Sequence, residues 1–152
     1  MRILLDTNVL GRLANTSDPD HQLAENAVAA IRGGGYLPCI VPQDIFEFWV
    51  VATRPKENNG FGLSAPEAQE RVSKFKSVFL FCDDSPRIFE EWEKTVSTYG
   101  VVGKNAHDAR FVAAAIVHGI AHFLTINTQD FRRYREITVL SLSDALQLNS
   151  PK

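Results

Sequence analysis

Cysteine is scarce in this chain. Its 152 residues include two cysteines, Cys39 and Cys82, and each lies in an apolar stretch. They do not form a CxxC pair, which excludes the redox and zinc sites that use this spacing. Isolated cysteines in apolar stretches are typical of buried thiols in a reducing compartment, so we expect the protein to act in the cytoplasm.

Long hydrophobic runs and an excess of one charge are also missing. The most apolar long segment, residues 109–126, contains Arg110, His118 and His122, so we do not expect it to span a membrane. Asp6 interrupts the stretch that would be apolar in a signal peptide. Lys plus Arg number 16 and Asp plus Glu 18, which excludes a polycation that acts by bulk charge alone.

The composition that is present belongs to a folded domain. Hydrophobic residues make up 45% of the chain and charged residues 22%, a balance that excludes intrinsic disorder. A chain of this length buries about 70% of its unfolded surface and needs no disulfides. The sequence contains no repeat or linker, and we predict one domain over residues 1–152.

Apolar segments of strand length alternate with segments of helical periodicity. The predicted strands are residues 2–5, 36–41, 78–82, 121–126 and 137–142. The predicted helices begin at or near Asp18, Pro42, Ser64, Ser85, Asn105 and Ser143. Residues 6–8 are predicted to form a polar turn and residues 54–63 a loop. This alternation predicts an α/β fold with a parallel sheet covered by helices on both faces, whose ligands bind at the carboxyl ends of the strands.

Two acidic residues in the first half occupy unusual positions. Asp6 directly follows the first strand, so it should lie at the carboxyl edge of the sheet, where ligands bind. A structural role, in which Asp6 caps the backbone of the turn, is the alternative. Glu47 lies in a helix that is apolar almost all the way round, and we expect this helix to be buried. A buried carboxylate is costly unless it is paired or bound to a metal, but a capping box with Asp44 is the structural alternative.

Two further acids lie in the second half. Asp108 shares a helix face with Val112 and Ala115, in a first turn where the helix dipole favours a carboxylate. The helix dipole, with Asn105 as the N-cap residue, would explain why an acid lies in the first turn. It would not explain why the acid is on the face that points toward the core. Asp130 follows the fourth strand and a polar turn, and alone it would be the N-cap of a short helix.

The predicted topology can bring these four carboxylates to one edge of the sheet. Clustered carboxylates repel one another, so such a group predicts bound cations. Ligands that offer oxygen alone suit Mg²⁺ or Mn²⁺ better than zinc.

Around the four acids the sequence resembles PIN-domain nucleases, in particular the VapC-type toxins of type II toxin–antitoxin pairs. The similar segments are LLDTNVL at residues 4–10, IFEF at 45–48, HDARFVAAA at 107–115 and LTINTQDF at 124–131. They span nearly the whole chain in the order and spacing of that family.

The resemblance implies a three-layer α/β/α fold and endoribonuclease activity that depends on Mg²⁺ or Mn²⁺. It also implies a homodimer and inhibition by a cognate antitoxin. The implied catalytic and metal-binding residues are Asp6, Glu47, Asp108 and Asp130, with Thr7, Asn8, Thr125 and Asn127 as supporting polar groups. Asp6 and Asp108 are expected to be direct ligands, and the other two acids to hold a second ion or metal-bound waters.

A negative pocket needs nearby bases to attract RNA. The candidates are Arg54, Lys56, Lys104, Arg110, Arg132, Arg133 and Arg135. A solvated surface charge is the alternative for each of them. The segment 54–60 departs from many relatives, which can alter the choice of substrate or partner.

Two other function classes stay open at this point. A catalytically silent module that binds RNA or a partner would gain nothing from four clustered carboxylates. A phosphoacceptor domain of the receiver type could use Asp83 and Asp84. Sequences that resemble receiver domains, however, have paired acids after the first strand and a Lys at the end of a late strand. This sequence has only Asp6 at the first place and no such Lys at the second. Metal-dependent RNA cleavage would separate these readings.

Overall fold

The computed structural model describes residues 1–149. Its strands are β1 (Arg2–Leu5), β2 (Leu37–Ile40), β3 (Leu80–Phe81), β4 (His122–Leu124) and β5 (Thr138–Leu140). Its α-helices are α1 (Thr7–Ala14), α2 (His21–Gly33), α3 (Pro42–Thr53), α4 (Ala65–Val78), α5 (Pro86–Tyr99), α6 (Asn105–Val117) and α7 (Leu142–Leu146). Short 3₁₀ turns lie at Lys56–Asn58, Thr128–Asp130 and Gln147–Asn149. In this part of the chain no helix combines the length and apolar character needed to cross a bilayer.

The strands form one parallel sheet in the order β3-β2-β1-β4-β5. In the centre, Ile3 of β1 is in register with Pro38 of β2 and His122 of β4. The chain winds outward from β1 to β3, then crosses back to β4 and β5. The direction of winding therefore reverses between β1 and β4, and ligands of open α/β sheets bind at such a point.

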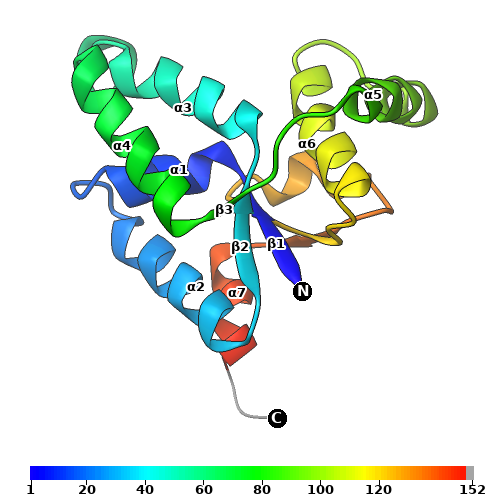
Figure 1. Ribbon diagram of the computed structural model, residues 1–152, viewed down its shortest axis with the longest axis horizontal. Coiled ribbons are helices and arrows are strands. Elements are labelled where there is room, and N and C mark those ends of the chain that lie inside the picture. The colour runs from blue at the N-terminus through cyan, green and yellow to red at the C-terminus, as the bar shows by residue number, and fades with distance from the viewer. Residues whose placement is uncertain (150–152) are drawn as a thin grey trace.

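Helices cover both faces of this sheet, as the sequence predicted (Figure 1). Ile3 and Leu5 belong to the core beneath α1 to α4 and α7, whereas Leu4 belongs to the core beneath α5 and α6. This alternation follows from the two-residue period of a strand. Cys39 and Cys82 are buried free thiols in the second core, which agrees with their predicted structural role.

The first helix differs from the prediction. Residues 6–8 were predicted to form a polar turn, but Asp6 is the N-cap residue of α1, which begins at Thr7. Val9 and Leu10 are fully buried and anchor this helix in the core. The polar side chains at its start are thus ordered by packing, and Thr7 and Asn8 are carried on a helix.

The helix that carries Glu47 also differs. It was predicted to be buried on all sides, but Phe46 is 63% and Val50 58% exposed. Helix α3 therefore packs along one face, which contains Phe48 and Ala52, and leaves an apolar strip open.

Several helix ends are displaced from the prediction. Helix α2 begins at His21, with Asp20 rather than Asp18 in the N-cap position. Lys104, not Asn105, precedes α6. Asp130 ends a 3₁₀ turn instead of capping a helix.

Candidate active site

Asp6 and Thr125 meet where the winding of the sheet reverses. The Asp6 N–H donates to the Leu124 carbonyl oxygen at 2.9 Å, which continues the ladder between β1 and β4. The Thr125 hydroxyl donates to Asp6 Oδ2 at 2.7 Å. Thr125 Oγ1 also accepts from Asn8 Nδ2 at 3.3 Å and from the Asn127 N–H at 3.0 Å. Three of the predicted supporting residues thus form one network that fixes an Asp6 oxygen.

Both oxygens of the Glu47 carboxylate are held. The Thr7 hydroxyl lies 3.2 Å from Oε1, and Gln43 Nε2 donates to Oε2 at 2.8 Å. Gln43 Nε2 also donates to the His107 carbonyl oxygen at 2.7 Å. Because His107 precedes Asp108 in the first turn of α6, Gln43 links the helices that carry these two acids.

Asp44 belongs to this network as well, although the sequence suggested only a capping role. The predicted capping box of Asp44 with Glu47 is not formed, because Val41 is the N-cap residue of α3. Asp44 caps it as the acid three residues later, with the Val41 N–H donating to Asp44 Oδ2 at 3.0 Å. Its other oxygen is 3.3 Å from the Thr7 hydroxyl, and the residue is fully buried. Burial raises the pKa of Asp44 well above its usual value. Its position one helical turn before Glu47 was the available sequence signal.

The acids shift one another's protonation. Burial raises the Asp6 pKa to about 7 against the hydrogen bond from Thr125, and the charges of Glu47 and Asp108 add to the increase. Burial also raises the pKa of Asp108, followed by the charges of Asp130 and Glu47. Asp6, Glu47 and Asp108 therefore share a region in which negative charge is unfavourable.

These three acids line a cavity of about 700 Å³ at the carboxyl edge of the sheet. The other lining residues are Thr7, Asn8, Gly11, Arg12, Asn15, Asp18, Phe48, Val51, Arg54, Asn59, Gly60, Phe61, Asn127 and Phe131. Asp130 is exposed and lies outside the lining, although its charge reaches Asp108. Within residues 1–149, no three acidic, His or Cys side chains are grouped closely enough to hold a metal ion in this arrangement.

The predicted bases are distributed differently from the acids. Among them, Arg54 is the one that lines the cavity within the described residues. The charge of Lys104 reaches Asp108 and partly opposes the rise of its pKa. Arg110 instead pairs with Asp84 at 3.2 Å. Lys56, Arg132, Arg133 and Arg135 are exposed and lie outside the lining. Arg12, which the sequence argument missed, lines the cavity from α1.

The PIN domain family model matches residues 3–137. The chain belongs to the PIN domain family. The match runs from within β1 to the residue before β5 and includes all four predicted acids. No curated protein sequence matches this PIN domain significantly.

Solved structures share the fold of this PIN domain. VapBC2 from Rickettsia felis, bound to a promoter DNA fragment, has a TM-score of 0.69 at 16% identity and covers 93% of this chain and 98% of its own. A toxin–antitoxin complex from Klebsiella pneumoniae has a TM-score of 0.64 at 24% identity, over 92% and 97%. VapC20 of Mycobacterium tuberculosis, described as a sarcin–ricin loop cleaving toxin, has a TM-score of 0.60 at 15% identity, over 80% and 86%.

Proposed function

We propose that this PIN domain is a metal-dependent endoribonuclease and the toxin of a toxin–antitoxin pair that acts in the cytoplasm. The observation that carries the proposal is the meeting of Asp6, Glu47 and Asp108, from three separate elements, in one cavity at the reversal point of the sheet. The fold shared with VapC20, described as a sarcin–ricin loop cleaving toxin, supports the choice of RNA as the substrate.

The donor set fits a divalent cation. All the acidic ligands offer oxygen, which suits Mg²⁺ or Mn²⁺. Burial raises the pKa of Asp6 and the charges of Glu47 and Asp108 add to it, so a cation at this place would favour the charged carboxylate. Asp6 and Asp108 would bind the ion directly, while Glu47 and Asp130 would hold a second ion or metal-bound waters. A bound ion of this kind lowers the pKa of water and neutralises charge on a phosphate.

The chain's own groups fix the acids for this task. Thr125, itself held by Asn8, orients Asp6. Thr7 and Gln43 orient Glu47. Fixed carboxylates lose less freedom on binding an ion, and such outer partners contribute about 10–100-fold to metal affinity or activity in other sites.

Incubation of the purified protein with total RNA tests the proposal. Mg²⁺ or Mn²⁺ should support internal cleavage, and EDTA should stop it. Cleavage that persists in EDTA would contradict the metal requirement. Phosphorylation by a small phosphodonor, without RNA cleavage, would favour the receiver alternative, but the observed strand order differs from the 2-1-3-4-5 order of such folds. RNA binding without cleavage in any metal would favour the catalytically silent module.

Gln43→Leu should weaken the site with little effect on folding. The substitution keeps similar volume but removes the donor to Glu47 Oε2 and the link to His107. We expect Mn²⁺ affinity, measured by calorimetry, and RNA cleavage to fall by about 10–100-fold. Gln69→Leu, which changes an exposed glutamine of α4, is the matched control. Unchanged Mn²⁺ affinity in Gln43→Leu would show that this link is dispensable.

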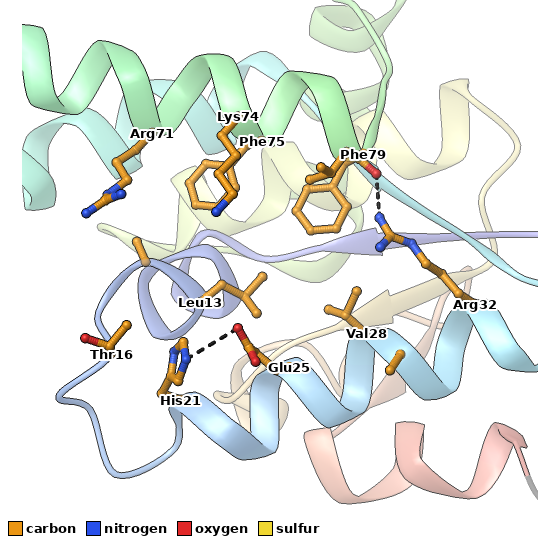
Figure 2. A pocket seen from close by; sticks show the side chains of 13 residues that line it. Leu13, Thr16, His21, Glu25, Val28, Arg32, Arg71, Lys74, Phe75 and Phe79 are labelled. Carbon is orange, nitrogen blue, oxygen red and sulfur yellow. Dashed lines mark hydrogen bonds and ion pairs between the residues drawn. The ribbon is translucent and has the colours of Figure 1, made fainter.

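A groove between α2 and α4 provides a surface for an antitoxin-type partner (Figure 2). Its volume is about 420 Å³, and Val28, Phe75 and Phe79 form an apolar floor. The basic side chains at its edges are Arg32, Arg71 and Lys74, while the acid Glu25 is paired with His21 at 3.4 Å. This surplus of positive charge fits a partner segment with apolar side chains flanked by acids.

Ala29→Arg should disrupt binding of the partner. Ala29 is exposed and lines the groove. An arginine side chain at this position would occupy the groove, and binding of the partner would have to remove water from its charge, which is costly. We expect the affinity for the antitoxin encoded beside this gene to fall at least about tenfold. Asn26→Arg, on the same helix but outside the groove lining, should bind normally. Equal loss in both variants would place the partner elsewhere.

A homodimer is the further assembly that we propose. Phe46 and Val50 are exposed and lie one helical turn apart on α3, which supports it. Neighbouring apolar side chains at a surface are typical of interfaces between subunits.

A further inference from the structure

The cavity extends well beyond the carboxylates. Its volume of about 700 Å³ lies in the range of about 300–1,000 Å³ typical of ligand pockets, and far exceeds the space that one or two ions need. Two further segments contribute to its lining, namely the end of α1 with Arg12 and Asn15, and the segment that follows α3, with Arg54 and residues 59–61.

Two guanidinium groups belong to this part of the lining, that of Arg12 on α1 and that of Arg54 directly after α3. The Arg12 side chain is 35% exposed, and its Nε lies 3.5 Å from Asp18 Oδ2. Arg54 Nη2 donates to the Asn59 carbonyl oxygen at 3.2 Å, and its Nε is buried without a hydrogen-bond partner in residues 1–149. Both side chains are thus held in place while keeping donors for a ligand.

The segment after α3 is rigidly built. The Phe61 N–H donates to the Val51 carbonyl oxygen at 3.0 Å, and the Gly62 N–H to that of Arg54 at 2.9 Å, so the chain folds back on the end of α3. Gly60 allows this return, because a Cβ there would lie 1.9 Å from the Arg54 carbonyl oxygen. Asn59, which precedes it, has a φ of 63°. The phenyl ring of Phe61 also closes against α1, where a Cβ on Gly11 would be in ordinary contact with it.

The charges along the cavity lining are unevenly distributed. Asp6, Glu47 and Asp108 come from the carboxyl edge of the sheet and the helices beside it. Within residues 1–149 the rest of the lining contains the bases Arg12 and Arg54 and one acid, Asp18, which pairs with Arg12. A phosphate flanking the reacting one cannot lie among the carboxylates, because like charges repel. A guanidinium group is the side chain best suited to bind it, since its planar donors match phosphate oxygens.

We propose that Arg12, Arg54 and Asn59 form a binding subsite for the RNA backbone next to the bond that is cut. The two arginines bind phosphates flanking the reacting one, and the exposed side chain of Asn59 contacts the adjoining sugar or base. This inference rests on the proposed endoribonuclease function and adds to it the path of the strand, which runs from the sheet edge between α1 and the segment after α3.

RNA binding by an inactive protein tests this subsite. A fluorescent single-stranded RNA of mixed sequence is titrated with Asp108→Asn protein that also carries Arg12→Ala, Arg54→Ala or, as a control, Arg87→Ala. Arg87 is an exposed arginine of α5 outside both pockets. We expect each cavity variant to weaken binding about tenfold, and the slope of log affinity against log salt to fall by about 0.7. Arg87→Ala should change neither quantity.

Three other outcomes are decisive. Unchanged RNA affinity in both cavity variants, with the wild type still cleaving RNA, would overturn the subsite and leave the proposed function standing. Normal RNA affinity together with lost antitoxin binding would overturn it by assigning the arginines to the protein partner. If the wild type neither binds nor cleaves RNA, the proposed function fails, and the subsite fails with it.

Discussion

We expect Asp108→Asn to reduce RNA cleavage by at least about 10³-fold while leaving the protein folded. The substitution removes one negative charge from the proposed ligand set and almost no volume. Asp108 is partly exposed and makes no hydrogen bond that the fold needs within residues 1–149. Asp6→Asn should have the same effect on cleavage. Initial rates on a defined RNA, with Mn²⁺ at saturation, give the comparison.

Asp83→Asn is the matched control for these variants. Asp83 is an exposed acid that follows β3, outside the cavity, so its charge should not affect cleavage. In cells without the antitoxin, the wild type and Asp83→Asn should arrest growth, and Asp108→Asn should not. Full cleavage by well-folded Asp108→Asn protein would show that the site is assigned to the wrong residues.

The sequence predicted the sheet well because buried strands are set by local composition. The stretches around β1, β2 and β4 are mostly apolar, and each strand lies within the range that was predicted for it. The second core behaves alike, since the α6 face that carries Val112 and Ala115 is fully buried. The spacing of hydrophobic residues along a segment is a local property of the sequence, and the fold buries the face that this spacing predicts.

Helix α1 could not be read in the same way. Its first turn contains Thr7 and Asn8, whose side chains favour turns, and this local preference pointed away from a helix. The burial of Val9 and Leu10 against the sheet overrides the preference. Missing this helix also hid Arg12, which reaches the cavity from its last turn.

The contacts of the site were the least predictable. Thr7 meets Asp44 and Glu47 across 37 and 40 residues of sequence, and nothing in either segment encodes the distance. The position of Asp44 one turn before Glu47 indicated that the two acids share a helix face, but a capping role explained Asp44 locally and nothing predicted its contact with Thr7. Arg132 and Arg133 follow Asp130 in sequence, yet they lie outside the cavity, because proximity along the chain does not determine the direction of a side chain.

The raised pKa of Asp6 predicts an unusual dependence of stability on pH when metal is absent. Asp6 is 7% exposed, and its carboxyl group keeps its proton up to a pH of about 7 in the folded protein, whereas the unfolded chain releases it near 3.8. Between these values the folded state binds more protons, so the free energy of unfolding falls as the pH rises. The shift corresponds to about 4 kcal/mol as an upper limit. Buried Asp44 and half-buried Asp108, whose pKa values are also raised, act in the same direction.

Thermal melts in EDTA should therefore give a lower melting temperature at pH 8 than at pH 5. Asp6→Asn should flatten this dependence, because it removes the group with the raised pKa. The surface acids Glu67 and Asp144 have pKa values that are lowered by the hydrogen bonds of their helix caps. The stabilisation that they contribute to the fold is therefore lost only at a pH below this interval. The hydrogen bond with Cys39 lowers the pKa of Cys82 to about 6, outside the cavity, so the difference between the wild type and Asp6→Asn is what reports the cavity over the interval from pH 5 to 8. A melting temperature that rises across it would contradict the buried, mutually repelling carboxylates.

Metal should reverse the trend. Mn²⁺ binds the deprotonated carboxylates of the folded protein and not the unfolded chain, so its stabilisation grows as the pH rises. At 100 times the dissociation constant the gain is about 2.7 kcal/mol, or about 5–10 °C for a domain of this size. Asp108→Asn should melt higher than the wild type in EDTA, since it removes repulsion, and should respond less to Mn²⁺. Asp83→Asn should keep the full response. If Mn²⁺ shifted the wild type and Asp108→Asn equally, the ion would be bound elsewhere, and the carboxylates of the cavity would need another explanation.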